Sequence, residues 1–112
     1  MTNQELIDIP AKILSQLGGY EFIIMTGSKN IAYYGMALTM SLSKNKSKAS
    51  HLKIEYDYNS DLYIVSFLKI TLKKGIEILN KIDGVYSDML IRIFEEETGL
   101  DTRIPAIYRK QN

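Results

Sequence analysis

Apolar and polar residues alternate along two stretches in the middle of the chain. Residues 36–42 hold a large apolar side chain at every second position, with Ala, Thr or Ser between them. Residues 51–57 alternate in the same way, with Leu52, Ile54 and Tyr56 separated by polar or charged residues. A period of two places successive side chains on opposite faces of a strand. We therefore predict two strands, each with one buried and one solvated face.

Three other segments contribute to the predicted sheet. Residues 62–70 form the most apolar of the expected strands. Residues 20–26 lie between glycines, are short for a helix, and have a Phe-Ile-Ile-Met centre that favours a strand buried on both faces. Residues 72–79 are predicted as a fifth strand with Gly75 as bulge or turn, and a helix is the alternative there.

Helical patterns occur at the two ends of the chain. Near the start, an apolar stripe is interrupted by Pro10, which predicts a turn over residues 3–8 and then a helix from Pro10 to about Leu17. Gly18 and Gly19 are expected to end that helix.

Near the other end, apolar residues fall at helical spacing, from Val85 to Phe94. Asp83 and Asp88 suit the start of this helix, where the helix dipole is positive. Gly99 is expected to end it in a left-handed conformation.

The fold class predicted from this order is α+β. We expect a single domain with a mostly antiparallel four- or five-stranded sheet, one face of which is covered by the N-terminal and C-terminal helices. Its predicted parts are an N-terminal helical segment (1–16), the sheet with the C-terminal helix (17–100), and an extended or frayed tail (101–112) with the basic pair Arg109 and Lys110 near its end. A chain of 112 residues fits one domain.

Composition excludes several kinds of chemistry. The chain has no cysteine and one histidine, which removes disulfides, thiolate zinc sites, iron–sulfur clusters and thiol nucleophiles. We therefore expect no cofactor, no metal and no enzymatic activity. No signal sequence or membrane-length apolar run is present, so we expect a cytoplasmic protein with no membrane partner. The net charge of +1 creates no global attraction for nucleic acid.

Three separated motifs resemble a known group of proteins. They are LGG followed by FI and MTGSKN in residues 17–30, DLYIVSFLKI in residues 61–70, and GVYSDML followed by F and TGL in residues 84–100. The combination is similar to small uncharacterised proteins encoded by phages and prophages. The typical pattern has Ala where this chain has Ser28 and an aromatic residue where it has Ile31. The resemblance implies a phage or prophage context, in the cytoplasm of the host cell, and implies no activity, cofactor or catalytic residue.

Residues 26–30 have the residue types of a phosphate loop. A true loop of that kind has two glycines between a strand and a helix, so that backbone amides at the helix N-terminus face the phosphate. Here one glycine is present and another strand is expected to follow. We interpret Thr26–Asn30 as a strand-to-strand turn, with an anion or nucleic-acid contact as the less favoured alternative.

Other titratable residues are isolated or grouped in ways that favour structural roles. His51 has no second histidine or cysteine to form a metal site. Asp57 and Asp61 are interpreted as turn-capping residues in preference to an acid–base pair. The run Glu95–Glu97 is interpreted as a solvated helix face.

The densest positive cluster is a lysine-rich loop. It contains Lys44, Lys46 and Lys48, and Lys53 follows closely. A basic loop beside exposed tyrosines would hold single-stranded nucleic acid, with lysines on phosphates and rings on bases. The tyrosines that could lie near this loop are Tyr33, Tyr34, Tyr56 and Tyr58. The alternative is a solvated loop that protects the sheet from edge-to-edge pairing.

Two functional hypotheses follow. The first is a non-enzymatic phage or prophage accessory protein that binds a host or phage protein, and the alternative is a single-stranded nucleic-acid-binding module with a Lys/Tyr-rich face. A self-paired edge strand would also make a homodimer. The candidate macromolecule-binding residues are Lys29, Asn30, Tyr33, Tyr34, Lys44, Lys46, Lys48 and Lys53. Convergence of residues 29–34 with residues 44–53 on one concave face would favour nucleic acid, and divergence would favour a protein partner.

Overall fold

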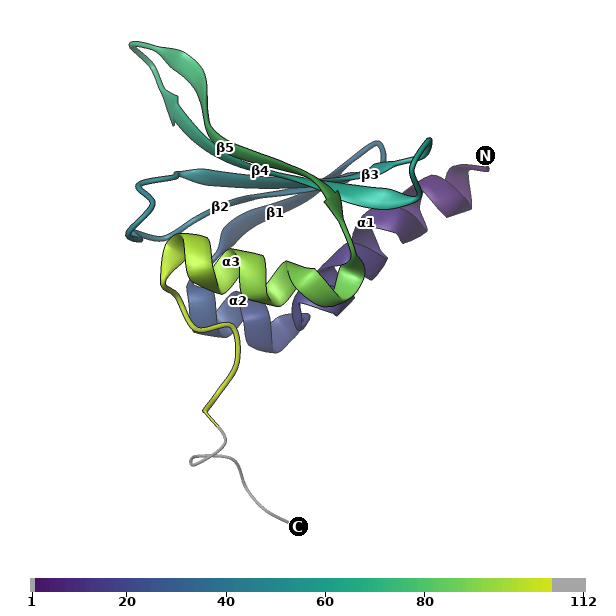
Figure 1. The fold of residues 1–112 in the computed structure, drawn as a ribbon, viewed down its shortest axis with the longest axis horizontal. Helices are drawn as coiled ribbons and strands as arrows, with labels where there is room; N and C mark the ends of the chain where they lie inside the picture. Colours follow the sequence, from purple (N-terminus) through teal and green to yellow (C-terminus); the bar gives the residue numbers. More distant parts are fainter. Residues whose placement is uncertain (1, 106–112) are drawn as a thin grey trace.

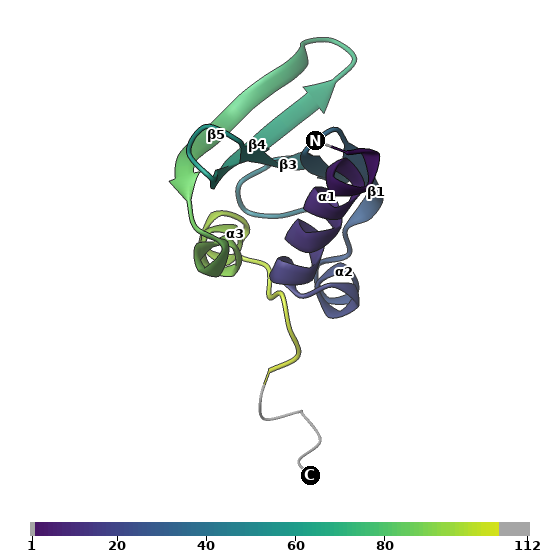
Figure 2. The same ribbon diagram turned by 90° about the vertical axis from the view of Figure 1, so that its right-hand side faces the viewer.

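The chain folds as one antiparallel sheet with three helices on one of its faces (Figures 1 and 2). The computed structural model describes residues 2–105, with residues 3–7 described by their backbone alone. In chain order the elements are α1 (Asn3–Leu17), α2 (Tyr20–Thr26), β1 (Lys29–Tyr34), β2 (Ala37–Ser41), β3 (His51–Asp57), β4 (Leu62–Thr71), β5 (Gly75–Val85), the 3₁₀ turn η1 (Ser87–Met89) and α3 (Leu90–Thr98). The strands lie in the order β1-β2-β3-β4-β5. The prediction of a single α+β domain with an antiparallel sheet is confirmed.

The alternating strands place their large apolar side chains toward the helices. Leu38 and Met40 of β2 lie opposite Ile54 and Leu52 of β3, and all four are buried. The other face of the sheet, called the open face below, carries polar residues in its central row. That row runs across the strands through Thr39, Lys53, Ser66 and Lys81. The predicted half-buried strands at residues 36–42 and 51–57 are thus confirmed.

The helices close the core with aromatic and aliphatic side chains. Phe22 of α2 and Phe94 of α3 meet edge to face, with ring centroids 5.0 Å apart. Ile13 and Leu17 of α1 are also fully buried. All three helices thus pack on the same face of the sheet and bury the apolar side chains of the strands.

The prediction of a strand at residues 20–26 is wrong, because this segment is helix α2. Its buried residues, Phe22 and Thr26, are four positions apart, while Tyr20 and Ile24 are exposed. That spacing is helical, and burial of Phe22 against Phe94 outweighs the strand preference of the Phe-Ile-Ile-Met sequence. Gly27 ends the helix at φ 67°, and its N–H bonds to the Ile23 carbonyl.

The N-terminal helix is longer than predicted. Residues 3–8 were expected to form a turn, but α1 continues from Asn3 to Leu17 with Pro10 inside it. Pro10 lacks the N–H that a helix normally bonds to the carbonyl four residues earlier. Its ring is buried, so packing offsets part of that loss. The predicted end is confirmed: Gly18 and Gly19 both have positive φ, and the Gly19 N–H bonds to the Leu14 carbonyl.

Residues 27 and 28 connect helix α2 to strand β1, so the predicted strand-to-strand turn at Thr26–Asn30 is also wrong. After Gly27, the chain enters edge strand β1 at Lys29, a strand that the sequence pattern did not reveal. Asn30 has φ 55° and marks a register shift against β2. This irregularity, together with the exposure of most β1 side chains, explains why no alternation was visible there.

The β4–β5 hairpin extends beyond the layer of helices (Figures 1 and 2). The prediction of a fifth strand is confirmed, but β5 begins at Gly75 and continues to Val85, beyond the predicted residues 72–79; the helical alternative there is wrong. Gly75 has φ 71° and begins β5 directly after the turn. Exposed apolar side chains gather on this hairpin: Ile70, Leu72, Ile76, Ile78 and Leu79.

The C-terminal helix begins later than predicted. Asp83 and Val85 belong to β5, and α3 starts at Leu90 after η1, because Val85 pairs with Tyr63 in the sheet. Its predicted end is confirmed, since Gly99 has φ 73° and bonds to the Glu95 carbonyl. Of the predicted tail, residues 101–105 carry no helix or strand, and Arg109 and Lys110 lie outside the described residues.

Candidate functional site

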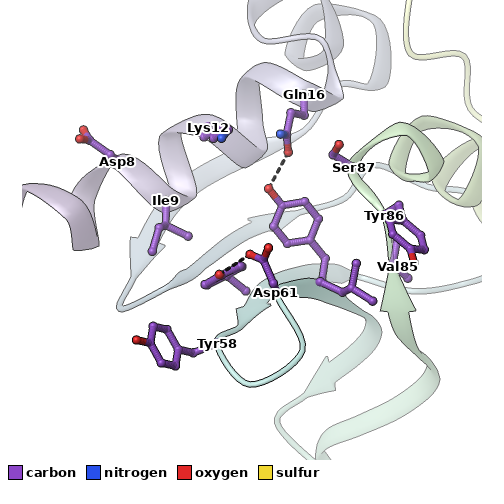
Figure 3. A pocket seen from close by; sticks show the side chains of 12 residues that line it. Asp8, Ile9, Lys12, Gln16, Tyr58, Asp61, Val85, Tyr86 and Ser87 are labelled. Atoms are coloured by element: carbon purple, nitrogen blue, oxygen red, sulfur yellow. Dashed lines mark hydrogen bonds between the residues drawn. The ribbon is translucent and has the colours of Figure 1, made fainter. Parts of the chain in front are cut away.

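A groove of about 500 Å³ opens between α1 and the end of the sheet where β3 turns into β4 (Figure 3). The start of η1 closes one side. Four tyrosines line it, and we call it the tyrosine groove: Tyr56, Tyr58, Tyr63 and Tyr86. Asp61 and Gln16 contribute its main polar groups, so the groove combines aromatic surface with a few placed hydrogen-bonding atoms, as binding sites for small groups do.

The β3–β4 turn positions one wall of the groove. Asp57 caps this turn: its carboxylate accepts bonds from the Asn59 N–H at 3.1 Å and the Ser60 hydroxyl at 2.9 Å. The Asp61 N–H then bonds to the Asp57 carbonyl at 2.9 Å. The predicted capping role is confirmed for Asp57. Asp61 instead turns its side chain into the groove from a left-handed backbone with φ 60°.

The Asp61 carboxylate is held by a tyrosine. The Tyr56 hydroxyl donates a 2.5 Å hydrogen bond to Asp61 Oδ1. This bond raises the pKa of Tyr56 above its ordinary value of 10.0, because the phenolate form would lose the bond and face the carboxylate charge. The hydrogen bond therefore favours the neutral phenol of Tyr56 beside the Asp61 carboxylate.

Tyr63 links the floor of the groove to α1. Its hydroxyl donates a 2.7 Å hydrogen bond to Gln16 Oε1. Burial raises the pKa of Tyr63, and the bond to Gln16 partly opposes that rise. The Tyr63 ring also meets the Tyr56 ring edge to face, with centroids 6.3 Å apart. Two of the four tyrosines are thus fixed by hydrogen bonds and by each other.

The other two tyrosines are exposed. Tyr58 is 68% exposed and Tyr86 is 59% exposed, and they lie on either side of Asp61 in Figure 3. Both line the groove. Their rings therefore offer stacking surface to an incoming group, next to a charged carboxylate.

The groove offers binding chemistry: stacking, hydrogen bonding and one carboxylate at its centre. Among residues 2–105, no group of three or more His, Cys, Asp or Glu side chains is arranged to hold a metal ion. His51 lies on the open face with its ring nitrogens near the hydroxyls of Ser50 (2.8 Å) and Ser41 (3.4 Å).

All the predicted macromolecule-binding lysines except Lys53 lie at the other end of the sheet from the groove. Lys29 and Asn30 begin β1 beside the end of β2, where Asn30 Nδ2 donates to Ser41 Oγ at 3.0 Å. The loop that follows β2 carries the lysines and is ordered by Asn45, whose amide donates to the carbonyls of Ser43 (2.8 Å) and Ala49 (2.9 Å).

This loop contacts the end of α3. The Lys46 N–H bonds to the Thr98 carbonyl at 3.1 Å, and its side chain lies against Gly99. A cation there stabilises the negative end of the α3 dipole. Lys46 therefore has a structural role that its place in a polar loop did not suggest, although it is exposed, as Lys44 and Lys48 are.

The predicted tyrosines are separated from these lysines. Tyr33 and Tyr34 end β1, about 15 Å along the strand from Lys29 at 3.3 Å per residue. Lys53 is at the middle of the open face, 3.8 Å from the Glu55 carboxylate. The structure brings Lys29 and Asn30 to the same end of the sheet as the lysine loop, and does not bring Tyr33 and Tyr34 there. Binding by these residues stays a prediction.

The segment Thr26–Asn30, which has the residue types of a phosphate loop, uses its polar groups in hydrogen bonds within the protein. Thr26 Oγ1 bonds to the Phe22 carbonyl and to Ser28 Oγ, each at 2.7 Å, and the Ser43 hydroxyl donates to the Thr26 carbonyl at 2.6 Å. The segment also follows the C-terminus of α2, where the helix dipole is negative. This polarity is opposite to the one that attracts a phosphate.

The glutamate run is not simply a solvated face. Glu97 accepts a 2.9 Å bond from Asn80 of β5, and Glu95 accepts bonds from the backbone and hydroxyl of Thr102. Glu96 alone stays exposed, 4.0 Å from Arg92. Successive carboxylates on a helix point in different directions, so two of the three reach partners on other segments.

Sequence reasoning did not identify the tyrosine groove. The sequence pattern associates Tyr56 and Tyr58 with the lysines, and it favours a turn-capping role for Asp61 over an acid–base pair with Asp57. The sequence does contain one signal, which is its number of tyrosines, eight in 112 residues. Three of them, Tyr56, Tyr58 and Tyr63, lie in or beside the β3–β4 turn. Gln16 and Tyr86 come from distant parts of the chain and join the groove only in the fold.

No family model, curated protein or solved structure matches this chain. Among the described residues, no helix is both long and apolar enough to cross a membrane. The geometry of the tyrosine groove is therefore the basis for a functional assignment.

Proposed function

We propose that the protein is a non-enzymatic accessory protein of phages or prophages that binds a host or phage protein, and that the tyrosine groove receives a segment of this partner. The observation that carries the proposal is the pair of exposed tyrosines, Tyr58 and Tyr86, beside a groove of about 500 Å³. Tyrosine is enriched in protein interfaces because its ring gives a large contact area at a low cost in side-chain entropy.

The walls of the groove support this proposal because they are already fixed. Tyr63 is bonded to Gln16 and Tyr56 to Asp61, so binding would not need to order these side chains. A preformed site loses less conformational entropy on binding and so gains affinity. The resemblance of residues 17–100 to phage proteins supports the cellular setting.

A single-stranded nucleic-acid partner is the weaker candidate. Such sites combine cations for phosphates with rings on which bases stack. Here the lysine loop and Lys29 lie at one end of the sheet, while Tyr33, Tyr34 and the groove lie at the other. The divergence of rings and cations favours a protein partner.

Co-purification of the tagged protein from host cells tests the proposal. A Tyr58→Ala/Tyr86→Ala variant is expected to lose a protein that the unmodified chain retains. The matched control is Tyr20→Ala/Tyr34→Ala, which removes two rings that are 77% and 76% exposed and lie outside the groove. Equal retention by all three proteins would contradict the proposal, and recovery of nucleic acid alone, lost at raised salt, would favour the alternative.

A further inference from the structure

The chemistry of the tyrosine groove suggests which group of the partner it holds. We propose that the groove binds an arginine side chain of the partner protein, with the guanidinium stacked on Tyr58 or Tyr86 and hydrogen-bonded to Asp61. This inference rests on the proposed function and names the partner's anchoring residue.

The charge of the groove lining favours a cation. Its charged residues are Asp8, Lys12 and Asp61, so the lining carries one more negative than positive charge. Oδ1 of Asp61 accepts one hydrogen bond, from Tyr56, and no side chain or backbone group of the described residues donates to its Oδ2. A cationic donor is the natural complement of that oxygen.

The aromatic rings of the groove favour arginine over lysine. A cation over the face of a tyrosine is attracted by the electrons of the ring, within about 6 Å of its centre. Arginine suits this setting better than lysine, because its planar guanidinium stacks on a ring while its edge donates to a carboxylate. Lysine carries a compact, strongly hydrated charge, which gains less from a flat aromatic wall.

The backbone of Asp61 has a left-handed conformation. A left-handed conformation costs most residues free energy, and glycine or asparagine would hold this turn at least as well. The turn does not use the Asp61 carboxylate, because Asp57 provides the capping bonds. A charged side chain at this position therefore serves the groove.

Peptide titrations of the full chain test the inference. The probes are the blocked tripeptides Gly-Arg-Gly and Gly-citrulline-Gly, followed by backbone amide shifts in NMR. Citrulline has the shape of arginine without its charge. We expect the arginine peptide to shift the amides of Tyr58, Asp61 and Tyr86 and to bind at least about tenfold more tightly than the citrulline peptide, as for a charged hydrogen bond worth about 1.5 kcal/mol or more.

The Asp61→Asn variant is the matched control, because asparagine tolerates the left-handed turn and still accepts the Tyr56 hydrogen bond. The preference for arginine over citrulline should disappear in this variant. Equal binding of the two peptides to the unmodified chain, or a preference that survives in Asp61→Asn, would overturn the inference.

The outcomes separate this inference from the proposed function. If both peptides shift groove amides equally, the groove binds peptides without an arginine anchor, and only the inference fails. If neither peptide binds, the inference fails, and the co-purification experiment decides the proposed function independently. Agmatine, a free guanidinium compound, is the last arm: binding as tight as that of the arginine peptide would indicate a small amine ligand and overturn the assignment to a protein.

Discussion

The Tyr63 hydroxyl of β4 donates a 2.7 Å hydrogen bond to Gln16 Oε1 of α1, although the two residues are 47 positions apart in the chain. This bond joins the N-terminal helix to the sheet at the floor of the tyrosine groove. A structural hydrogen bond therefore lies inside the candidate binding site. Changes to Tyr63 should affect stability, whereas changes to the exposed Tyr58 and Tyr86 should affect binding.

Tyr63→Phe should lower the free energy of unfolding by about 1 kcal/mol, the usual net value of one hydrogen bond. Gln16 is half-buried, so water reaches the oxygen that loses its partner, which keeps the loss small. Urea unfolding followed by circular dichroism measures the change. Tyr58→Phe is the control and should leave stability unchanged, because no hydrogen bond of the described residues uses its hydroxyl. A loss above about 3 kcal/mol for Tyr63→Phe would mean that this hydroxyl supports more than one contact.

Phe22→Ala and Phe94→Ala should each destabilise the protein by about 3–5 kcal/mol, because each removes a fully buried ring. Their effects should not add, because the rings touch. A double-mutant cycle should give a coupling energy of about 0.5–1.5 kcal/mol. A cost below about 1 kcal/mol for Phe22→Ala would contradict the packing of α2 against α3.

Asp61→Asn should lower the pKa of Tyr56 toward about 10, because the charged acceptor that raises it is removed. Because the pKa of Tyr56 is higher in the folded chain than in the unfolded chain, its protonated form contributes to stability. This contribution is complete at pH values below the pKa of the unfolded chain, and it is lost as pH rises through the pKa of the folded chain. Stability should therefore fall above about pH 10, and less steeply in the variant. Tyrosinate absorbance and urea unfolding across that range measure both effects. Identical Tyr56 titrations in the two proteins would contradict the hydrogen bond.

Leu72→Ser should change the free energy of unfolding by less than about 0.5 kcal/mol, because Leu72 is fully exposed at the tip of the β4–β5 hairpin. Leu52→Ala on β3, which is buried, should cost about 2–5 kcal/mol in the same assay. A large loss for Leu72→Ser would show that another surface covers the hairpin, as in a self-associated form, and sedimentation would then detect the assembly.

Local periodicity predicted the centre of the fold. The alternation in β2 and β3 was visible because one face of each strand packs on the helices and the other is polar. Local periodicity did not predict α2, because seven residues are too few to distinguish a helical period from a continuous apolar run. The burial of Phe22 against Phe94, a contact across 72 positions, decides that segment, and no local pattern encodes it.

Local sequence patterns could not predict the candidate site, because it too depends on contacts between distant parts of the chain. Tyr56, Asp61 and Tyr63 are close in sequence, but Gln16 and Tyr86 reach the groove only because α1 and the end of β5 fold against this part of the sheet. The lysine cluster was conspicuous in the sequence because its members are consecutive. Proximity along the chain did not place it beside the tyrosines, since β1 and β3 run between the two ends of the sheet.

The most direct test of the proposed protein-binding groove is photo-crosslinking in cells that contain the natural partner. A photoreactive phenylalanine analogue replaces Tyr58 in one protein and Tyr20, which lies on α2 outside the groove, in another. We predict a discrete protein adduct from position 58 and none from position 20, with the crosslinked partner peptide containing an arginine. Equal adducts from both positions, or adducts with nucleic acid alone, would contradict the account.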